Sequence, residues 1–366
     1  MLNHQDRVGD PELGHQMIKK RLGFLLLSAL APVLVIASLY KISELAKSKP
    51  NGFIRLEPPH ILQPGDTKDL GFNSFYIAGL SKDSIYLGNH STPFSLLVVA
   101  YNLKTSAIRP VNWGNGIKVA KGALLSVDSG NVFLNDGLTG QRISLDLDDK
   151  GDRQVVKTFP YLASVQIGRT GMIYRSIDKQ ENVLIKQAGD IRSAIIDSSL
   201  LIKQGDGIFS TDGLLFSSRA QNKIVYIYYY RNQFLCIDTN LKRIYTGKTI
   251  DTISRAHIKL AHVKSDKATT MSAPPLKVNK SACASDQYIF INSALTANNE
   301  PHEVLNAVEI IDVYNLKDGK YKLSFYLPNL TGKRVSDFKV YGNKLVAIYG
   351  KYLTVYTLKF WRTNKN

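Results

Sequence analysis

Six short apolar runs recur along this chain, most with an aromatic residue in them or beside them. A second extended stretch usually follows each run after a turn. The central residues of successive runs are 47, 40, 53, 64 and 57 positions apart. A period of about fifty residues with two or three strand patterns per unit is typical of the blades of a β-propeller. The runs are Ile85–Leu87, Val132–Leu134, Met172–Tyr174, Val225–Ile227, Ile289–Ile291 and Val346–Ile348.

The fourth repeat shows the strand pattern most clearly. Ile224–Tyr230 predicts one strand, Arg231–Gln233 a turn and Phe234–Asp238 the return strand. Side chains alternate between the two faces of a strand, and here both faces are apolar or aromatic. This is expected of a sheet packed between two neighbouring blades. The alternative, an aromatic platform for sugars or bases, is less economical. The sixth repeat has the same form at Lys344–Tyr349 and Tyr352–Leu358.

The repeats together predict an all-β fold, a six-bladed β-propeller spanning residues 52–360. Helix is expected almost wholly before residue 52. Propeller rings commonly close when one chain terminus adds a strand to the blade that the other terminus forms. The extended segment Gly52–Leu56 is the candidate for that strand.

A 19-residue stretch without charge, Leu22–Tyr40, precedes the repeats. A helix of this length spans about 28 Å, close to the roughly 30 Å of a bilayer's hydrocarbon core. Val35–Ala37 allows a weak signal-cleavage site, but the run is longer than the apolar region of most signal peptides. We therefore expect an uncleaved signal-anchor, with a tail at residues 1–21, a juxtamembrane stalk at 41–51 and a short tail at 361–366.

The charge beside this stretch predicts its orientation. Lys19, Lys20 and Arg21 adjoin its N-terminal end, so the positive-inside rule favours a cytoplasmic N-terminus. The propeller would then lie in the periplasm or outside the cell. Residues 1–21 carry +1 of the chain's formal +17, which leaves +16 on the exported part. Anionic partners, either a protein or an acidic surface glycan, are favoured. Basic residues are scattered rather than interleaved with aromatics, so nucleic acid is not expected.

Two cysteines, Cys236 and Cys283, lie in or beside strand patterns of different repeats. An exported domain permits a disulfide. Buried free thiols, which behave as small hydrophobic groups, are the preferred interpretation.

The C-terminal repeats resemble a known family. The stretch Ile311–Tyr321 (IDVYNLKDGKY), followed by Ser324–Pro328 (SFYLP), is similar to a motif of six-bladed TolB/NHL-like propellers, which marks the step from an inner to an outer strand. Membrane-associated versions common in Bacteroidetes are the most similar. The resemblance covers roughly residues 52–360 as a pattern. The resemblance implies a fold and a location at the membrane rather than a reaction, because many such relatives have no assigned activity.

Motifs for catalysis, nucleotide binding and metal binding give no site. Gly247–Thr249 lacks the first glycine of a phosphate-binding loop, and Ser176–Lys179 matches S-x-x-K without its partner motifs. His257 and His262 are five positions apart, which places them on opposite faces of a strand. We therefore expect no catalytic residue, cofactor or bound metal.

Two functional hypotheses remain. The first is a non-catalytic, membrane-tethered module that binds or scaffolds a protein or an anionic surface. The second is a propeller enzyme, such as a lyase, hydrolase or quinone-dependent dehydrogenase, with its site at the central channel. Long loops on a rigid scaffold often carry function, so the connections at 253–284 and 294–306 are the predicted contact regions. The 294–306 connection could also offer metal ligands, although a solvated loop explains it better. Its candidate contact residues are Asn298, Asn299, Glu300, His302 and Glu303.

Overall fold

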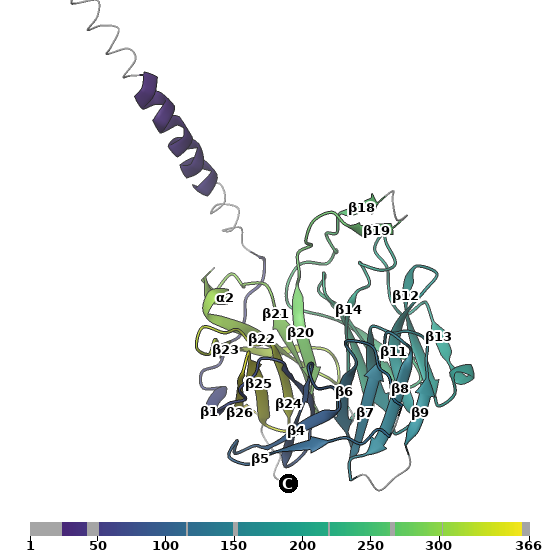
Figure 1. The fold of residues 1–366 in the computed structure, drawn as a ribbon. Coiled ribbons are helices and arrows are strands. Elements are labelled where there is room, and N and C mark those ends of the chain that lie inside the picture. The colour runs from purple at the N-terminus through teal and green to yellow at the C-terminus, as the bar shows by residue number, and fades with distance from the viewer. Residues whose placement is uncertain are drawn as a thin grey trace, which may run out of the picture. The chain divides into compact units, whose positions relative to one another are not determined.

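The computed structural model describes residues 24–41, 51–114, 116–148, 153–218, 220–263, 268–301 and 303–360 (Figure 1). The predicted tails at 1–21 and 361–366 and most of the predicted stalk lie outside these ranges. The chain divides into two compact units, Met1–Pro50 and Asn51–Asn366.

The described part of the first unit is the helix Phe24–Lys41. Its 18 residues have a mean hydropathy of 2.0, so by length and composition it could cross a membrane. It falls within the predicted span apart from Lys41, while Leu22 and Gly23 lie outside the described residues. The hydroxyl of Ser28 donates a hydrogen bond to the carbonyl of Leu25 at 2.9 Å, so this side chain is satisfied within the helix.

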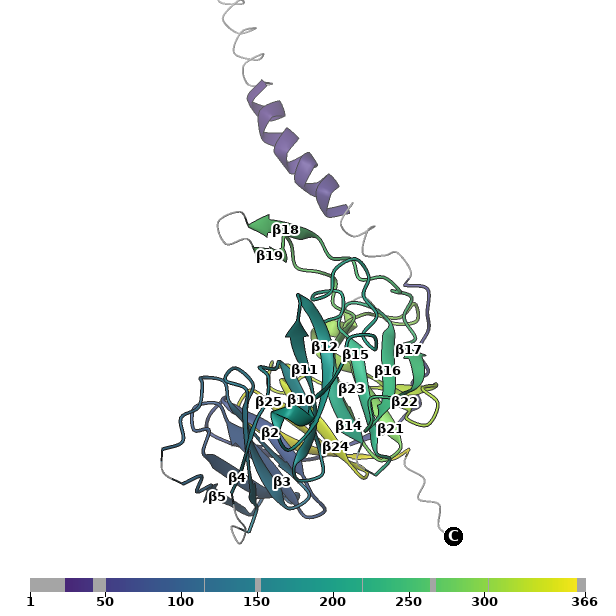
Figure 2. The ribbon, with the colours of Figure 1, turned by 90° about the vertical axis from the view of Figure 1, so that its right-hand side faces the viewer.

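The second unit is a six-bladed β-propeller, as predicted (Figures 1 and 2). Each blade is a four-stranded antiparallel sheet whose strands follow one another in the chain, except in blade 6. The strands of blades 1 to 3 are β2 (Phe75–Leu80), β3 (Ser84–Asn89), β4 (Ser95–Ala100), β5 (Ser106–Pro110); β6 (Leu124–Asp128), β7 (Asn131–Asp136), β8 (Gln141–Asp146), β9 (Gln154–Lys157); and β10 (Ala163–Ile167), β11 (Gly171–Asp178), β12 (Glu181–Ala188), β13 (Ile195–Asp197). Those of blades 4 to 6 are β14 (Gly213–Ser218), β15 (Lys223–Tyr228), β16 (Gln233–Asp238), β17 (Arg243–Lys248); β20 (Asn279–Ala284), β21 (Tyr288–Ser293), β22 (Val308–Asn315), β23 (Tyr321–Pro328); and β24 (Asp337–Tyr341), β25 (Lys344–Tyr349), β26 (Tyr352–Leu358), β1 (Leu62–Asp69).

All six apolar runs lie in the second strand of a blade. Every residue of the runs is buried except Tyr86, which is half-buried. In β15, Tyr226 packs into the cluster shared with blade 3, while Val225 and Ile227 pack into the cluster shared with blade 5. The tyrosines therefore serve packing between blades, as the sequence pattern favours.

The ring closes through a different segment from the predicted one. β1 pairs with β26 and completes blade 6, with Leu62 opposite Leu358 and Asp69 opposite Tyr352. The prediction that Gly52–Leu56 closes the ring was wrong, because these residues run along blade 5 instead. The amide of Ser324 in β23 donates to the carbonyl of Leu56 at 2.8 Å. β1 gave no apolar pattern because it is an outer, mostly exposed strand with proline and glycine.

Both cysteines are buried and free, as expected. Cys236 belongs to the core cluster between blades 4 and 5, and Cys283 to the cluster between blades 5 and 6.

One end of the ring carries the long loops, and we call it the loop face. Two kinds of connection meet there, because the strands of each blade are antiparallel: the turns from the second to the third strand and the connections from one blade to the next. Shorter elements lie in these loops: α2 (Val304–Ala307), and a separate two-stranded sheet formed by β18 (Leu260–Val263) and β19 (Ala268–Met271) (Figure 1). The 3₁₀ turn η1 (Ile191–Ser193) lies at the opposite end of blade 3.

Candidate binding cavity between blades 2 and 3

The junction between blades 2 and 3 is more open than the others. Among the described strands, the first strands of neighbouring blades approach each other closely at five junctions, and β6 and β10 do so much less. Arg142 of β8 crosses this junction and is fully buried. Its guanidinium donates to the side chain of Gln166 at 3.0 Å and to the carbonyl of Thr170 at 2.7 Å. Burial lowers the pKa of Arg142 to about 10, so it remains charged at neutral pH.

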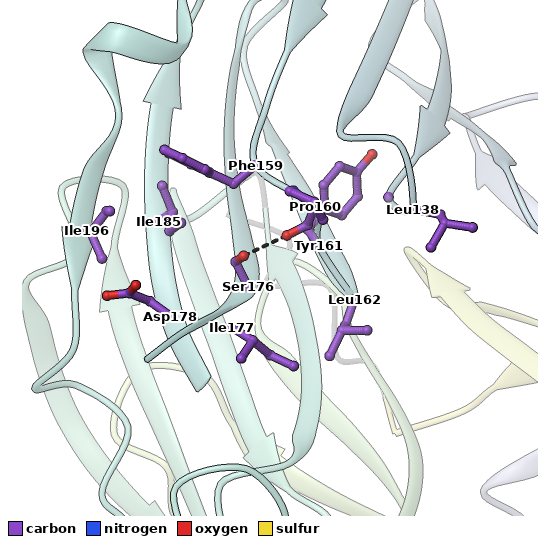
Figure 3. Close-up of a pocket in the computed structure, with 11 residues that line it drawn as sticks. Leu138, Phe159, Pro160, Tyr161, Leu162, Ser176, Ile177, Asp178, Ile185 and Ile196 are labelled. Atoms are coloured by element: carbon purple, nitrogen blue, oxygen red, sulfur yellow. Dashed lines mark hydrogen bonds between the residues drawn. The ribbon is translucent and has the colours of Figure 1, made fainter. Parts of the chain in front are cut away.

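On the loop face, the same junction leaves a cavity of about 340 Å³ (Figure 3). The β7–β8 turn, the β9–β10 connection and strands β11 to β13 form its wall. Three of its apolar residues are strongly exposed to solvent: the exposed fraction is 74% for Leu138, 61% for Leu162 and 49% for Ile177. We call it the apolar cavity. Its lining residues are Gly137, Leu138, Phe159, Pro160, Tyr161, Leu162, Ser176, Ile177, Asp178, Ile185 and Ile196.

Hydrogen bonds to backbone carbonyl groups hold the wall of the apolar cavity in place. The hydroxyl of Ser176 donates to the carbonyl of Pro160 at 2.6 Å (Figure 3). The amide of Tyr161 donates to the carbonyl of Gly137 at 2.8 Å. Gly140, in the same turn as Leu138, has a φ of +68°, and a Cβ there would lie 2.4 Å from the carbonyl oxygen of Thr158. The turn therefore requires glycine, and the exposed leucines extend from a fixed backbone.

A second cavity, of about 530 Å³, adjoins the first at the loop-face end of the ring's centre. The two share four lining residues, from Gly137–Leu138 and Tyr161–Leu162. We call this one the channel cavity. Its lining mixes apolar and polar side chains, and the charged or ionisable ones are Tyr76, His90, Lys121, Asp136, Tyr161, Asp337 and Lys339.

Both carboxylates of the channel cavity already accept backbone hydrogen bonds. Asp136 accepts from the amide of Ala120 at 2.7 Å, and Asp337 accepts from the amide of Ile77 at 2.8 Å. Burial raises the pKa of Asp337, and the nearby charge of Lys339 opposes that shift. The carboxylates thus serve the structure of the ring, while two ammonium groups, those of Lys121 and Lys339, line the cavity.

Three of the five predicted contact residues bind the chain's own N-terminal segment. Asn298 accepts a hydrogen bond from the amide of Gly52 at 3.1 Å, and Asn299 accepts one from the amide of Arg55 at 3.0 Å. Glu300 is buried, and its carboxylate pairs with the guanidinium of Arg55 at 2.5 Å. Their side chains are thereby used within the molecule.

The other two predicted contact residues follow these three in the sequence. Glu303 precedes α2, and His302 lies outside the described residues. A partner-contact role for the loop stays a prediction. Within the described residues, no group of three or more His, Cys, Asp or Glu side chains is placed to hold a metal ion.

Sequence patterns did not reveal the apolar cavity or the role of Arg55. The one available sign of the cavity was isolated leucine and isoleucine residues in turns, such as Leu138 between two glycines. For Arg55, the local sequence gave no sign, because Arg55 and Phe53 are buried while the apolar Ile54 between them is 70% exposed.

Comparison with known proteins finds only distant likenesses among solved structures. No family model matches the chain, and no curated protein matches it. A member of the DUF4221 family from Bacteroides vulgatus is 13% identical, with 85% of this chain and 99% of that chain covered and a TM-score of 0.46. BamB from Moraxella catarrhalis is 10% identical, with 83% and 100% covered and a TM-score of 0.41. Virginiamycin B lyase from Staphylococcus aureus is 9% identical, with 80% and 99% covered and a TM-score of 0.45. Likenesses at this level carry no argument about this chain.

Proposed function

We propose that this chain is a membrane-tethered binding module for a partner protein. The helix at residues 22–40 anchors it as a single-pass protein with a cytoplasmic N-terminus, and the propeller lies outside the cytoplasm. The partner supplies an extended segment with an apolar side chain, which enters the apolar cavity, and acidic side chains, which lie in the channel cavity.

The exposed apolar wall carries this proposal. Leu138, Leu162 and Ile177 surround a concave site while remaining in contact with water. Large apolar side chains gathered on an exposed surface mark interaction sites, and binding energy concentrates where a partner's side chain fills a pocket. A fixed backbone adds to this, since a preformed site costs less to order on binding.

Charge supports an acidic partner. The exported part carries a formal +16, and Lys121 and Lys339 line the channel cavity beside the apolar one. The charge of Lys339 also acts on Asp337 of the same cavity, whereas Asp136 accepts the backbone amide of Ala120. Complementary charge speeds association and selects the partner.

Site-directed photocrosslinking tests the binding site. A photoreactive phenylalanine analogue at position 138 should capture one partner, and the crosslinked peptide should contain Asp or Glu beside an apolar residue. The substitution Leu162→Asp should abolish that capture, because a charged group in the apolar cavity excludes the partner's side chain. Ile108, 75% exposed on the outer strand of blade 1, is the matched control position for the crosslinker. The same partner captured from position 108, or captured despite Leu162→Asp, would refute the site.

Protease accessibility tests the tether. Protease added to intact spheroplasts should digest the propeller and leave residues 1–21 protected. A protected propeller would reverse the orientation, and a mature N-terminus at Ser38 would show that the helix is a cleaved signal.

A further inference from the structure

A separate hairpin projects from the loop face between blades 4 and 5. Within the described residues, β18 and β19 hydrogen-bond to each other and to no blade strand. We call residues 254–263 and 268–277 the arm. Leu260 lies opposite Met271, and the amide of Ser272 donates to the carbonyl of Lys259 at 2.8 Å, so the two sides run together. An isolated two-stranded hairpin is marginally stable in water, and a surface beneath it would stabilise it.

The chemistry of the arm suits an anionic bilayer surface. Its two segments contain Arg255, Lys259 and Lys277 and no acidic residue. Leu260 and Leu276 are 40% and 46% exposed although they are large and apolar. Basic side chains next to exposed leucines are typical of peripheral membrane contacts, where the cations attract lipid phosphates and the apolar groups enter the headgroup region.

The root of the arm lies where the chain enters the propeller. The hydroxyl of Thr252 donates to the carbonyl of Asn51 at 2.8 Å, and the side chain of Gln204 donates to the carbonyl of Ser254 at 3.0 Å. Asn51 follows the end of the apolar helix, Lys41, by ten residues. Ten residues reach at most about 35 Å in any conformation. A tethered propeller therefore cannot carry the root of the arm far from the membrane.

From these observations we infer that the arm docks on the anionic surface of the bilayer to which the propeller is tethered. Leu260 and Leu276 enter the headgroup region, and Arg255 and Lys259 bind lipid phosphates. Docking would fix the propeller in one orientation and decide which way the two cavities open. The inference rests on the tether of the proposed function and is independent of the partner protein.

A fluorescent label on the arm tests this inference in the full chain. Ala273 is exposed, and Ala273→Cys offers one reactive thiol because Cys236 and Cys283 are buried. The labelled chain is reconstituted into vesicles of phosphatidylcholine alone, or of equal parts phosphatidylcholine and phosphatidylglycerol. Both leaflets have the same composition, so either orientation of insertion gives the same readout. Vesicle flotation reports the tether, and an environment-sensitive dye with lipid-borne quenchers reports docking.

The expected result is flotation with both vesicles, with the dye shielded and quenched only on the anionic ones. Shielding should fade as salt shortens the Debye length to about 3 Å. Arg255→Gln with Lys259→Gln should lower the ratio of docked to undocked arm about 25-fold, since each cation contributes roughly fivefold. Lys104→Gln with Lys317→Gln is the matched control, since both lysines are exposed in turns at the opposite end of the ring.

Three results would overturn the inference. Flotation with a dye that stays water-exposed on anionic vesicles would refute docking and leave the tether intact. Shielding that is equal on both vesicles and insensitive to salt would show that the arm packs on protein instead. A chain that does not float with either vesicle would refute the tether, and with it this inference.

Discussion

Arg55 and Asp312 lie 257 residues apart in the sequence and form a buried, bidentate ion pair. Nε of Arg55 lies 2.7 Å from one carboxylate oxygen of Asp312, and Nη2 lies 3.2 Å from the other. The same guanidinium pairs with Glu300, so one cation serves two carboxylates. Burial raises the pKa of Asp312, while the charge of Arg55 opposes that shift. The hydroxyl of Ser324 donates a further hydrogen bond to Asp312 at 2.6 Å.

Replacing Arg55 should destabilise the propeller strongly. Arg55→Met leaves Asp312 and Glu300 as buried carboxylates without a cation, and breaking a buried pair in this way costs about 3–5 kcal/mol. Chemical denaturation followed by near-UV circular dichroism measures the loss. The control Lys351→Met removes an exposed ion pair with Asp69 and should change stability far less. Equal losses in the two variants would mean that the buried network does not hold residues 51–57 to blade 5.

Truncated chains test whether the stability of the ring depends on the closing strand β1 rather than on the residues before Asn51. A chain starting at Asn51 should unfold in one cooperative transition with a nearly helix-free far-UV spectrum, because it keeps Arg55 and the closing strand β1. A chain starting at Gly71 lacks β1 and leaves β26 as an exposed sheet edge, a template for aggregation. It should therefore aggregate or unfold at lower denaturant. Equal stability of the two chains would contradict the observed closure.

Strand positions were predictable where both faces of a strand are buried. Lys344–Tyr349 and Tyr352–Leu358 match β25 and β26, because an apolar run with a glycine turn encodes a hairpin locally. β1 was missed because its hydrogen bonds to β26 are formed across the whole chain and its side chains stay in water. The apolar cavity forms where the β7–β8 turn of blade 2 meets the β9–β10 connection and strands of blade 3, and no local pattern encodes how two blades meet.

The predicted contact loop also depends on a contact between residues far apart in the sequence. The polar run Asn298–Glu300 looked like a solvated contact surface, since polar residues in a long loop usually face water. Glu300 is instead buried against Arg55, a partner 245 residues earlier in the chain. Sequence spacing cannot indicate that pairing.

Alkaline pH should destabilise the fold through buried acids. Burial raises the pKa of Cys283 and of Tyr174 to about 12, from ordinary values of 9 and 10. The unfolded chain therefore releases these protons first, and the free energy of unfolding falls as pH rises from 9 towards 12, by about 1.4 kcal/mol per pH unit for each group. Urea denaturation across this range measures the slope. Cys283→Ala with Tyr174→Phe should make the slope shallower, while other buried tyrosines with a raised pKa, such as Tyr76, keep part of it. An unchanged slope would show that Cys283 and Tyr174 do not contribute.

Selection of binding peptides tests the central claim most directly. A random peptide library panned against the full chain in nanodiscs should enrich sequences with an aliphatic or aromatic residue beside Asp or Glu. The selected peptides should bind Leu138→Asp with Leu162→Asp at least tenfold more weakly, since each charge in the apolar cavity opposes an apolar anchor by more than about 1.4 kcal/mol. Ile108→Asp, on the outer strand of blade 1, should bind them as well as the unaltered chain. Enrichment without acidic or apolar residues, or equal binding by the cavity variant, would contradict a protein-binding site between blades 2 and 3.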